Sequence, residues 1–230
     1  MTDPLRVPAR FNGPPASGNG GYCAGAVAER LGGIVEVTLR APPPLEVPMT
    51  VERHDGALRV LDGARLVMEA RPASLDLAVP VPPSLEDAAD LSHGRWSGEH
   101  AYPSCFVCGP TRAPGDGLRI FPGRRPSDGV AAAPWTPDRS LAAEDERVRV
   151  RFLWAAMDCP GYFAAATPGL PALLGRMTAH VVCRPAVDEA CVVVGWALRG
   201  SARKLEAGTA IFGADGTLYA RARQTWIVVG

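Results

Sequence analysis

The segments GGYCAGAVAERLGGIVEVTLRAPP (residues 20–43) and PGYFAAATPGLPALLGRMTAHVVCRP (residues 160–185) read as two copies of one unit. Each copy opens with a Gly-Tyr pair followed by small residues. An apolar, strand-like run begins at the same interval of 12 residues past the tyrosine, which is Tyr22 in one copy and Tyr162 in the other. Self-similarity of this kind indicates that the chain contains an internal structural repeat.

Three further strand-like runs follow each copy. The tripeptides HDG, LDG and ADG separate several of these runs and predict hairpin turns, because glycine tolerates the positive φ that tight turns require. In the last run, the side chains of Leu218, Ala220, Ala222 and Gln224 share one face. The predicted strands cover residues 47–53, 57–63, 64–74, 190–200, 203–213 and 216–229.

Each half therefore reads as a strand, a helix rich in alanine and glycine, and a long antiparallel meander. A curved antiparallel sheet wrapped around a central helix is the hotdog fold. We predict an α+β double hotdog, with one hotdog unit in residues 1–74 and a second in residues 130–230. Residues 75–129 would link the two units.

The linker of 55 residues is much longer than an ordinary connection, which favours a functional or packed segment. Residues 82–92 predict a short helix, with Ser84 as its N-cap and Asp87 three residues later. The rest of the linker reads as a loop and carries the motif CFVCG at residues 105–109.

The CFVCG motif raises the question of a metal site. A single C-x2-C motif supplies two ligands, whereas a closed structural zinc site needs four. The further candidates in the linker are His93 and His100, which would complete a set with Cys105 and Cys108. This spacing matches no zinc-finger pattern, so we predict no metal and treat the cysteines as buried packing residues or a labile disulfide.

The composition excludes several classes of function. The 24 Lys and Arg residues balance the 24 Asp and Glu residues, so the charge offers no footprint for nucleic acid. No apolar run reaches the roughly 18 residues that a membrane span requires. The start of the chain lacks the features of a secretory signal, so we expect a cytoplasmic protein whose six cysteines are mostly reduced.

Asp158 is the residue whose position most needs an explanation. It stands within an apolar run that includes Trp154, Met157 and Phe163, where an unpaired carboxylate is unfavourable. One interpretation is that Asp158 caps a helix beginning near Gly161. The other is that its charge serves catalysis or ligand binding.

Two segments of the second half resemble a known family. GTLYARARQTWIVV (residues 216–229) resembles the last strand, and AAMDCPGYFAA (residues 155–165) the hotdog helix, of the double-hotdog acyl-CoA thioesterases of the medium-chain thioesterase II type. The likeness is clear over most of residues 130–230 and looser over residues 5–75.

In that family an Asp, a Gln and a Thr hold and activate the water that attacks the thioester. The resemblance implies that Asp158 takes the Asp position and Gln224 the Gln position. The Thr position falls near Gly175, and Thr178 is the nearest hydroxyl, so this sequence departs from the family pattern there.

The expected chemistry also requires donors for the thioester carbonyl. Backbone N–H groups at a helix start can polarise it, and GNGGY (residues 18–22) offers such a start. We predict that this segment meets Asp158 across the pseudo-twofold axis. Because Gly18 occupies the position that matches Asp158, we expect one competent site. The predicted substrate-binding residues are Asn19, Gly20, Gly21, Tyr22, Gly161 and Tyr162.

The predicted function is an acyl-CoA thioesterase, with coenzyme A entering only as part of the substrate and with no cofactor. The alternative is a non-catalytic double hotdog that binds acyl-CoA or lipid. Hotdog hydratase chemistry expects an Asp-x4-His pair, and none of the four histidines has an Asp five residues before it. Short edge strands make a homodimer of double hotdogs plausible.

Overall fold

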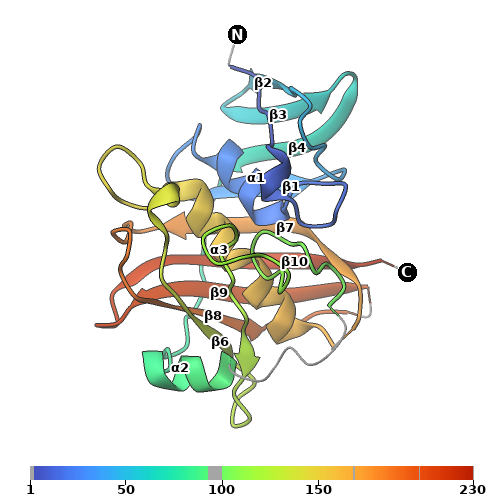
Figure 1. The fold of residues 1–230 in the computed structure, drawn as a ribbon. Helices are drawn as coiled ribbons and strands as arrows, with labels where there is room; N and C mark the ends of the chain where they lie inside the picture. The colour runs from blue at the N-terminus through green and yellow to red at the C-terminus, as the bar shows by residue number, and fades with distance from the viewer. Residues whose placement is uncertain (1–2, 93–99, 168, 202, 230) are drawn as a thin grey trace.

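The computed structural model describes residues 3–92, 100–167, 169–201 and 203–229. Its strands form one antiparallel sheet of 10 strands in the order β2-β3-β4-β1-β7-β10-β9-β8-β6-β5 (Figure 1). The first half of the chain supplies β1 (Val35–Leu39), β2 (Thr50–His54), β3 (Ala57–Asp62) and β4 (Arg65–Pro72). The remaining strands are β5 (Gly123–Arg124), β6 (Ala131–Trp135), β7 (Ala172–Val181), β8 (Cys191–Ala197), β9 (Lys204–Gly213) and β10 (Leu218–Val228).

The two halves of the sheet share one topology. Counted from the centre of the sheet, the first half runs β1-β4-β3-β2, and an isolated bridge from Leu5 to Met49 adds the first segment of the chain beside β2. The second half runs β7-β10-β9-β8-β6 in the same relative order. The halves join through the antiparallel β1–β7 pair, where Glu36 lies opposite Thr178. This arrangement is the double hotdog predicted from the repeat.

Two helices lie against the same face of this sheet. They are α1 (Gly20–Ala28) and α3 (Val150–Ala165), which pack against each other. Glycine makes the close approach possible, because a Cβ added to Gly25 would lie 2.7 Å from the Cα of Arg151. An ion pair of 2.6 Å between Arg151 and Glu29 joins the helices at the end of α1. Two short 3-10 helices, η1 (Ala9–Phe11) and η2 (Arg139–Leu141), complete this side of the molecule.

The two helices are not equal copies. With the Gly-Tyr pairs aligned, residue 20 corresponds to residue 160, so α3 begins ten residues earlier than α1. The predicted helix start near Gly161 is therefore wrong. Pro160 reads as a helix start in the sequence, but it lies inside α3. As a result, the N-terminus of the shorter α1 lies against the middle of α3, at Asp158.

A third helix, α2 (Leu85–Ser92), covers part of the opposite face of the sheet, beside β6 (Figure 1). Its predicted cap is confirmed, since the Asp87 N–H donates to Ser84 Oγ at 3.0 Å and the Ser84 hydroxyl donates to the Asp87 carboxylate at 2.7 Å. Ala88 is fully buried in a second apolar cluster on this face. The other buried members of that cluster are Val130, Ala132, Val192, Val194, Ala210 and Phe212.

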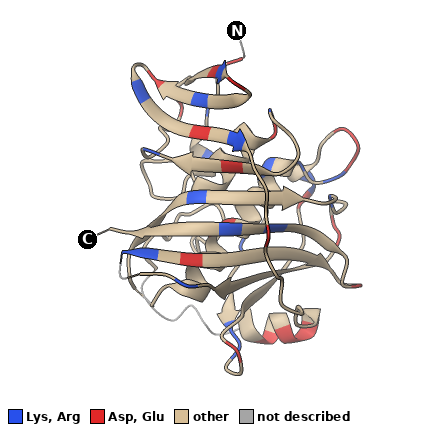
Figure 2. Ribbon diagram, turned by 180° about the vertical axis from the view of Figure 1, so that it is seen from behind, with Lys and Arg blue, Asp and Glu red and all other residues tan. Residues whose placement is uncertain are grey.

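The predicted hairpin strands are confirmed with shifted ends. Away from α2, the outer face of the sheet carries charged side chains, which Figure 2 shows as blue and red bands on neighbouring strands. On this face Arg71 forms an ion pair of 2.7 Å with Glu36. No described helix is both long enough and apolar enough to cross a membrane.

Candidate active site

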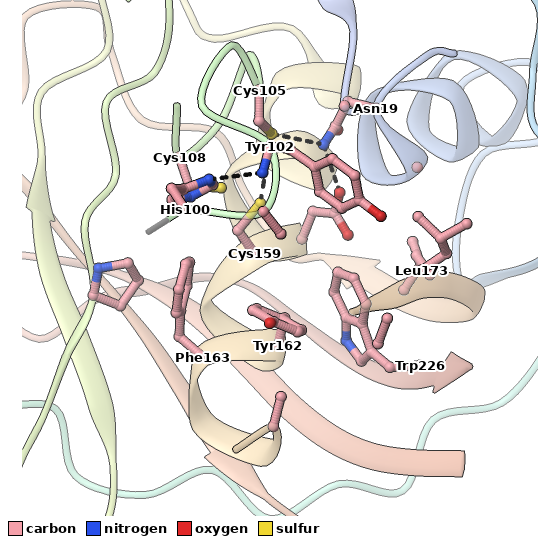
Figure 3. A pocket seen from close by; sticks show the side chains of 18 of the residues that line it. Asn19, His100, Tyr102, Cys105, Cys108, Cys159, Tyr162, Phe163, Leu173 and Trp226 are labelled. Carbon is pink, nitrogen blue, oxygen red and sulfur yellow. Dashed lines mark hydrogen bonds between the residues drawn. The ribbon is translucent and has the colours of Figure 1, made fainter. Parts of the chain in front are cut away.

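A cavity of about 320 Å³ opens where the start of α1, the linker, α3 and the central strands meet. Asn19, Tyr102 and three cysteines lie around one end, and aromatic and aliphatic side chains lie around the other (Figure 3). The first group includes Asn19, Gly20, His100, Tyr102, Cys105, Cys108, Asp158 and Cys159. The second includes Tyr162, Phe163, Ala166, Ala172, Leu173, Leu174 and Trp226.

Asp158 lies in the middle of α3 and is 3% exposed. The side-chain amide of Asn19 donates to Oδ2 of Asp158 at 2.6 Å, and the N–H of Gly21 donates to the same oxygen at 3.1 Å. Oδ1 is buried and accepts no hydrogen bond from the described residues. Burial raises the pKa of Asp158 to about 7, against the effect of the Gly21 and Asn19 donors. The carboxyl group thus has one oxygen held by the protein and one left for a ligand.

The interpretation that Asp158 caps a helix beginning near Gly161 is wrong. Asp158 does not start its own helix, which begins eight residues earlier at Val150. It does accept a hydrogen bond from Gly21 in the first turn of α1, across the helix pair, where the helix dipole favours a negative charge. The predicted meeting of Asp158 with the GNGGY segment is therefore present in the structure.

The start of α1 is held by Asn19. Asn19 is the N-cap, and its Oδ1 accepts from the N–H of Tyr22 at 2.9 Å while its amide binds Asp158. Gly20 is the first helical residue and lines the cavity. Its N–H has no acceptor within the helix, as expected for a first turn, and none among the other described residues. The helix start therefore presents a free donor beside the carboxylate.

Gln224 does not line the cavity. It lies beneath α3 on β10, fully buried, with its amide 2.7 Å from the carbonyl oxygen of Met157 and 3.2 Å from that of Asp158. Its Oε1 accepts from the indole N–H of Trp226 at 2.9 Å. The predicted contact of Gln224 with the attacking water is corrected, because all its polar atoms bind protein groups. Gln224 holds the backbone of the turn that carries Asp158, next to Pro160.

Thr178 is separated from Asp158 by the sheet. Successive strand residues point to opposite faces, and Met177 takes the buried face toward the helices. Thr178 instead points outward, where its hydroxyl lies 3.3 Å from Glu36 Oε2. The prediction of Thr178 as a catalytic residue is therefore wrong. Gly175 offers no hydroxyl, and its missing Cβ accommodates Ile227.

The predicted substrate-binding residues divide into two groups. Asn19, Gly20 and Tyr162 line the cavity, and the Tyr162 hydroxyl donates to the Leu170 carbonyl at 2.7 Å. The rings of Tyr22 and Phe11 stack at 4.1 Å, away from the cavity. Gly21 and Gly161 do not line it either. A Cβ on Gly161 would lie 1.8 Å from Gln224 Oε1, so this glycine serves the packing of helix on sheet.

Cys159 is a member of the site that the sequence did not predict. It lies directly after Asp158 in α3 and meets Cys105 and Cys108 of the linker, so that the three sulfur atoms lie within 4.8 Å of one another. His100 also borders the cavity but does not belong to this group. His93 lies outside the described residues. No local signal pairs Cys159 with residues more than fifty positions earlier.

No protein-family model matches the sequence, and no curated protein matches it. Solved structures do match over nearly the whole chain. A protein of unknown function with a hot dog fold from Alicyclobacillus acidocaldarius is 15% identical, with a TM-score of 0.65 over 99% of this chain and 92% of its own.

Two further matches carry functional names. The tesB protein of Mycobacterium avium subsp. paratuberculosis is 13% identical, with a TM-score of 0.61 over 98% of this chain and 91% of its own. A candidate thioesterase from Novosphingobium aromaticivorans is 12% identical, with a TM-score of 0.62 over 99% and 95%. At these identities the likeness is one of fold, and it agrees with the double hotdog.

Proposed function

We propose that the protein hydrolyses acyl-CoA thioesters in the cavity between α1 and α3, with Asp158 as the general base. The observation that carries the proposal is the state of the Asp158 carboxyl group. It is buried at the start of α1, and Oδ1 accepts no hydrogen bond within the described chain while Oδ2 accepts two. The names of two structures with the same fold favour thioester chemistry over other uses of such a site.

In the proposed reaction, Oδ1 of Asp158 accepts a hydrogen bond from a water molecule and orients it toward the thioester carbonyl carbon. As the water oxygen forms its bond to that carbon, its proton passes to Asp158 and the carbonyl electron pair moves onto oxygen. The N–H of Gly20 and the N-terminal end of α1 stabilise the resulting oxyanion. The oxyanion then re-forms the carbonyl as the C–S bond breaks, which gives the carboxylic acid, and the leaving thiolate takes the proton from Asp158.

Three residues support this step without taking part in the proton transfer. The Asn19 amide and the Gly21 N–H hold Oδ2, which fixes the direction of Oδ1. Gln224 is a positioning residue, because it binds the main-chain carbonyls of Met157 and Asp158 rather than the carboxylate. Asn19 and Gly21 thus fix the carboxyl group of Asp158, and Gln224 fixes the backbone that carries it.

The acyl group would occupy the apolar end of the cavity. Leu173 and Leu174 from β7 and Trp226 from β10 line that end, together with Phe163 from α3. These side chains offer a hydrophobic wall and few polar partners, which suits a hydrocarbon chain. A cavity of about 320 Å³ suits a short or medium acyl chain better than a long one.

The second candidate function is non-catalytic binding of acyl-CoA. One observation favours it: the hydroxyl of Thr178 is bonded to Glu36 on the outer face of the sheet, so the described site lacks the third group of the thioesterase pattern. Turnover decides between the two functions, since both predict that the ligand binds.

The test is thiol release from acyl-CoAs of increasing chain length, measured for the wild type and for Asp158→Asn. The amide keeps the shape of the carboxyl group but cannot take a proton, so we expect the rate to fall by about 100-fold or more. Asp90→Asn serves as the matched control, because Asp90 is an exposed residue of α2. If acyl-CoAs bind but none is hydrolysed at any chain length, non-catalytic binding would replace hydrolysis as the function of the site.

A further inference from the structure

Three buried cysteines come together at one end of the cavity. Cys105 and Cys108 belong to the linker and Cys159 to α3. The three Sγ atoms lie within 4.8 Å of one another, and those of Cys105 and Cys159 are 3.9 Å apart. Figure 3 shows the three side chains turned toward a common point, with His100 beside Cys108.

This spacing is that of a metal site. Zinc binds thiolates at about 2.3 Å in a tetrahedral arrangement, which separates the sulfur atoms by about 3.8 Å. The Cys105–Cys159 separation of 3.9 Å agrees with this value. A cation placed between the three sulfurs would need only small side-chain adjustments, whereas a disulfide requires two of the sulfurs to approach to about 2.0 Å.

The CFVCG turn is built to present its first sulfur. The side-chain amide of Asn19 donates to the Cys105 sulfur across a distance of 3.9 Å. Gly109 closes the turn through a hydrogen bond of 2.8 Å from its N–H to the Cys105 carbonyl. A Cβ on Gly109 would lie 2.4 Å from that carbonyl oxygen, so the turn requires glycine.

The turn is anchored to the rest of the chain on both sides. The N–H of Phe106 donates to the Asn12 carbonyl at 2.8 Å, and the N–H of Ile120 donates to the Val107 carbonyl at 2.9 Å. The side chains of Phe106 and Val107 are fully buried in the main core. The two linker sulfurs are therefore held in place before any ion binds.

We propose that Cys105, Cys108 and Cys159 bind one Zn²⁺ ion, with the fourth coordination position facing the cavity. All three cysteines line that cavity, so a water molecule or a ligand in it can complete the tetrahedron. The ion would join the linker to α3 and form one wall of the cavity. The proposal reverses the expectation of no metal, because α3 supplies a third thiolate that the spacing of the linker did not reveal.

The first test is the metal content of the full chain, purified without chelators from medium supplemented with zinc. The wild type is expected to carry about one Zn²⁺ per chain. Cys108→Ser and Cys159→Ser are expected to lose the ion or to weaken its binding by at least about 100-fold, measured against a competing chelator. Cys183→Ser is the matched control, because Cys183 is exposed and lies outside the cluster, and it should retain the ion.

The second test is cobalt substitution. Co²⁺ in the wild type and in Cys183→Ser should give the near-ultraviolet absorption of thiolate-to-metal charge transfer, and this absorption should be lost or reduced in Cys159→Ser. Far-ultraviolet circular dichroism checks that each variant is folded. These readouts do not depend on thioester hydrolysis, so they fail or succeed independently of the proposed function.

Three results would overturn the proposal. The first is less than about 0.1 zinc per chain together with no cobalt absorption in the folded wild type. The second is a disulfide within the cluster, seen as the loss of two hydrogens in the intact mass of the purified protein. The third is full zinc content in both Cys108→Ser and Cys159→Ser.

Discussion

The two oxygens of the Asp158 carboxyl group have different surroundings. Oδ2 is held by Asn19 and Gly21, and Oδ1 is buried with no hydrogen bond from a described residue. A buried acceptor without a partner is destabilising by about 1–3 kcal/mol. An oxygen that is left in this state at the wall of a cavity is best explained by a ligand or water that binds to it. This asymmetry is the reason for assigning the base to Asp158.

At the same scale, Gln224 supports the backbone around Asp158. We predict that Gln224→Leu lowers the free energy of unfolding by about 2–4 kcal/mol, because the carbonyls of Met157 and Asp158 and the indole N–H of Trp226 lose their partner. Urea unfolding measures the change. Thr225→Ala is the control, since Thr225 is only half-buried and bonds to Glu206. Unchanged stability with complete loss of hydrolysis would instead indicate that Gln224 contacts the water.

At the scale of elements, the contact between α1 and α3 positions the site. The contact relies on Gly21 and Gly25, which bring the start of α1 against α3 at Asp158. In most helices a Gly→Ala substitution is stabilising, by about 1 kcal/mol. In α1 the added methyl group would have no room, so the usual propensity effect is reversed.

We predict that Gly25→Ala destabilises the protein by about 1–3 kcal/mol through overpacking. The new Cβ would lie 2.7 Å from both the Arg151 Cα and the Trp154 Cβ. Thermal unfolding should show a lower Tm than that of the wild type. A higher Tm would mean that α1 can move away from α3 at no loss, which would contradict the proposed rigid placement of the α1 N-terminus.

At the scale of the whole molecule, the two halves form one sheet with a shared core. β1 of the first half pairs with β7 of the second, and the main apolar cluster contains residues from both halves. The linker belongs to the same body, since Phe106 and Val107 are buried in that cluster. The helices α1 and α3 pack against each other and the central strands β1 and β7 pair, so each half covers part of the other. The chain should therefore unfold as one cooperative unit.

Met68→Ala tests this cooperativity. Met68 is fully buried in β4, in the first half, and we expect its truncation to lower stability by about 2–5 kcal/mol. The described tryptophans, Trp135, Trp154, Trp196 and Trp226, all lie in the second half. Their fluorescence should nevertheless report the same lowered transition as far-ultraviolet circular dichroism. Two separate transitions would show that the halves unfold independently.

Much of this architecture could be predicted from local patterns. Apolar runs separated by Gly-containing turns marked the strands of both meanders, period-2 alternation marked the last strand, and Ser84 with Asp87 marked the start of α2. Each of these signals comes from residues within a few positions of one another, so it does not depend on contacts with distant parts of the chain. The predicted helix start near Gly161 was wrong because it also depended on local residues alone. Pro160 locally favours a helix start, but packing against the sheet and the carbonyl contacts of Gln224 maintain α3 through it.

The duplicated pattern was enough to predict a double hotdog, and the apolar run around Asp158 was enough to single out that carboxylate, because both are properties of short segments. The composition of the site depended on contacts between distant parts of the chain. Cys159 joins Cys105 across 54 residues, and Asn19 joins Asp158 across 139. Thr178 shows most simply what a local pattern does not determine. A shift of one residue along a strand moves a side chain to the other face, and only the folded sheet determines which residue, Met177 or Thr178, faces the helices.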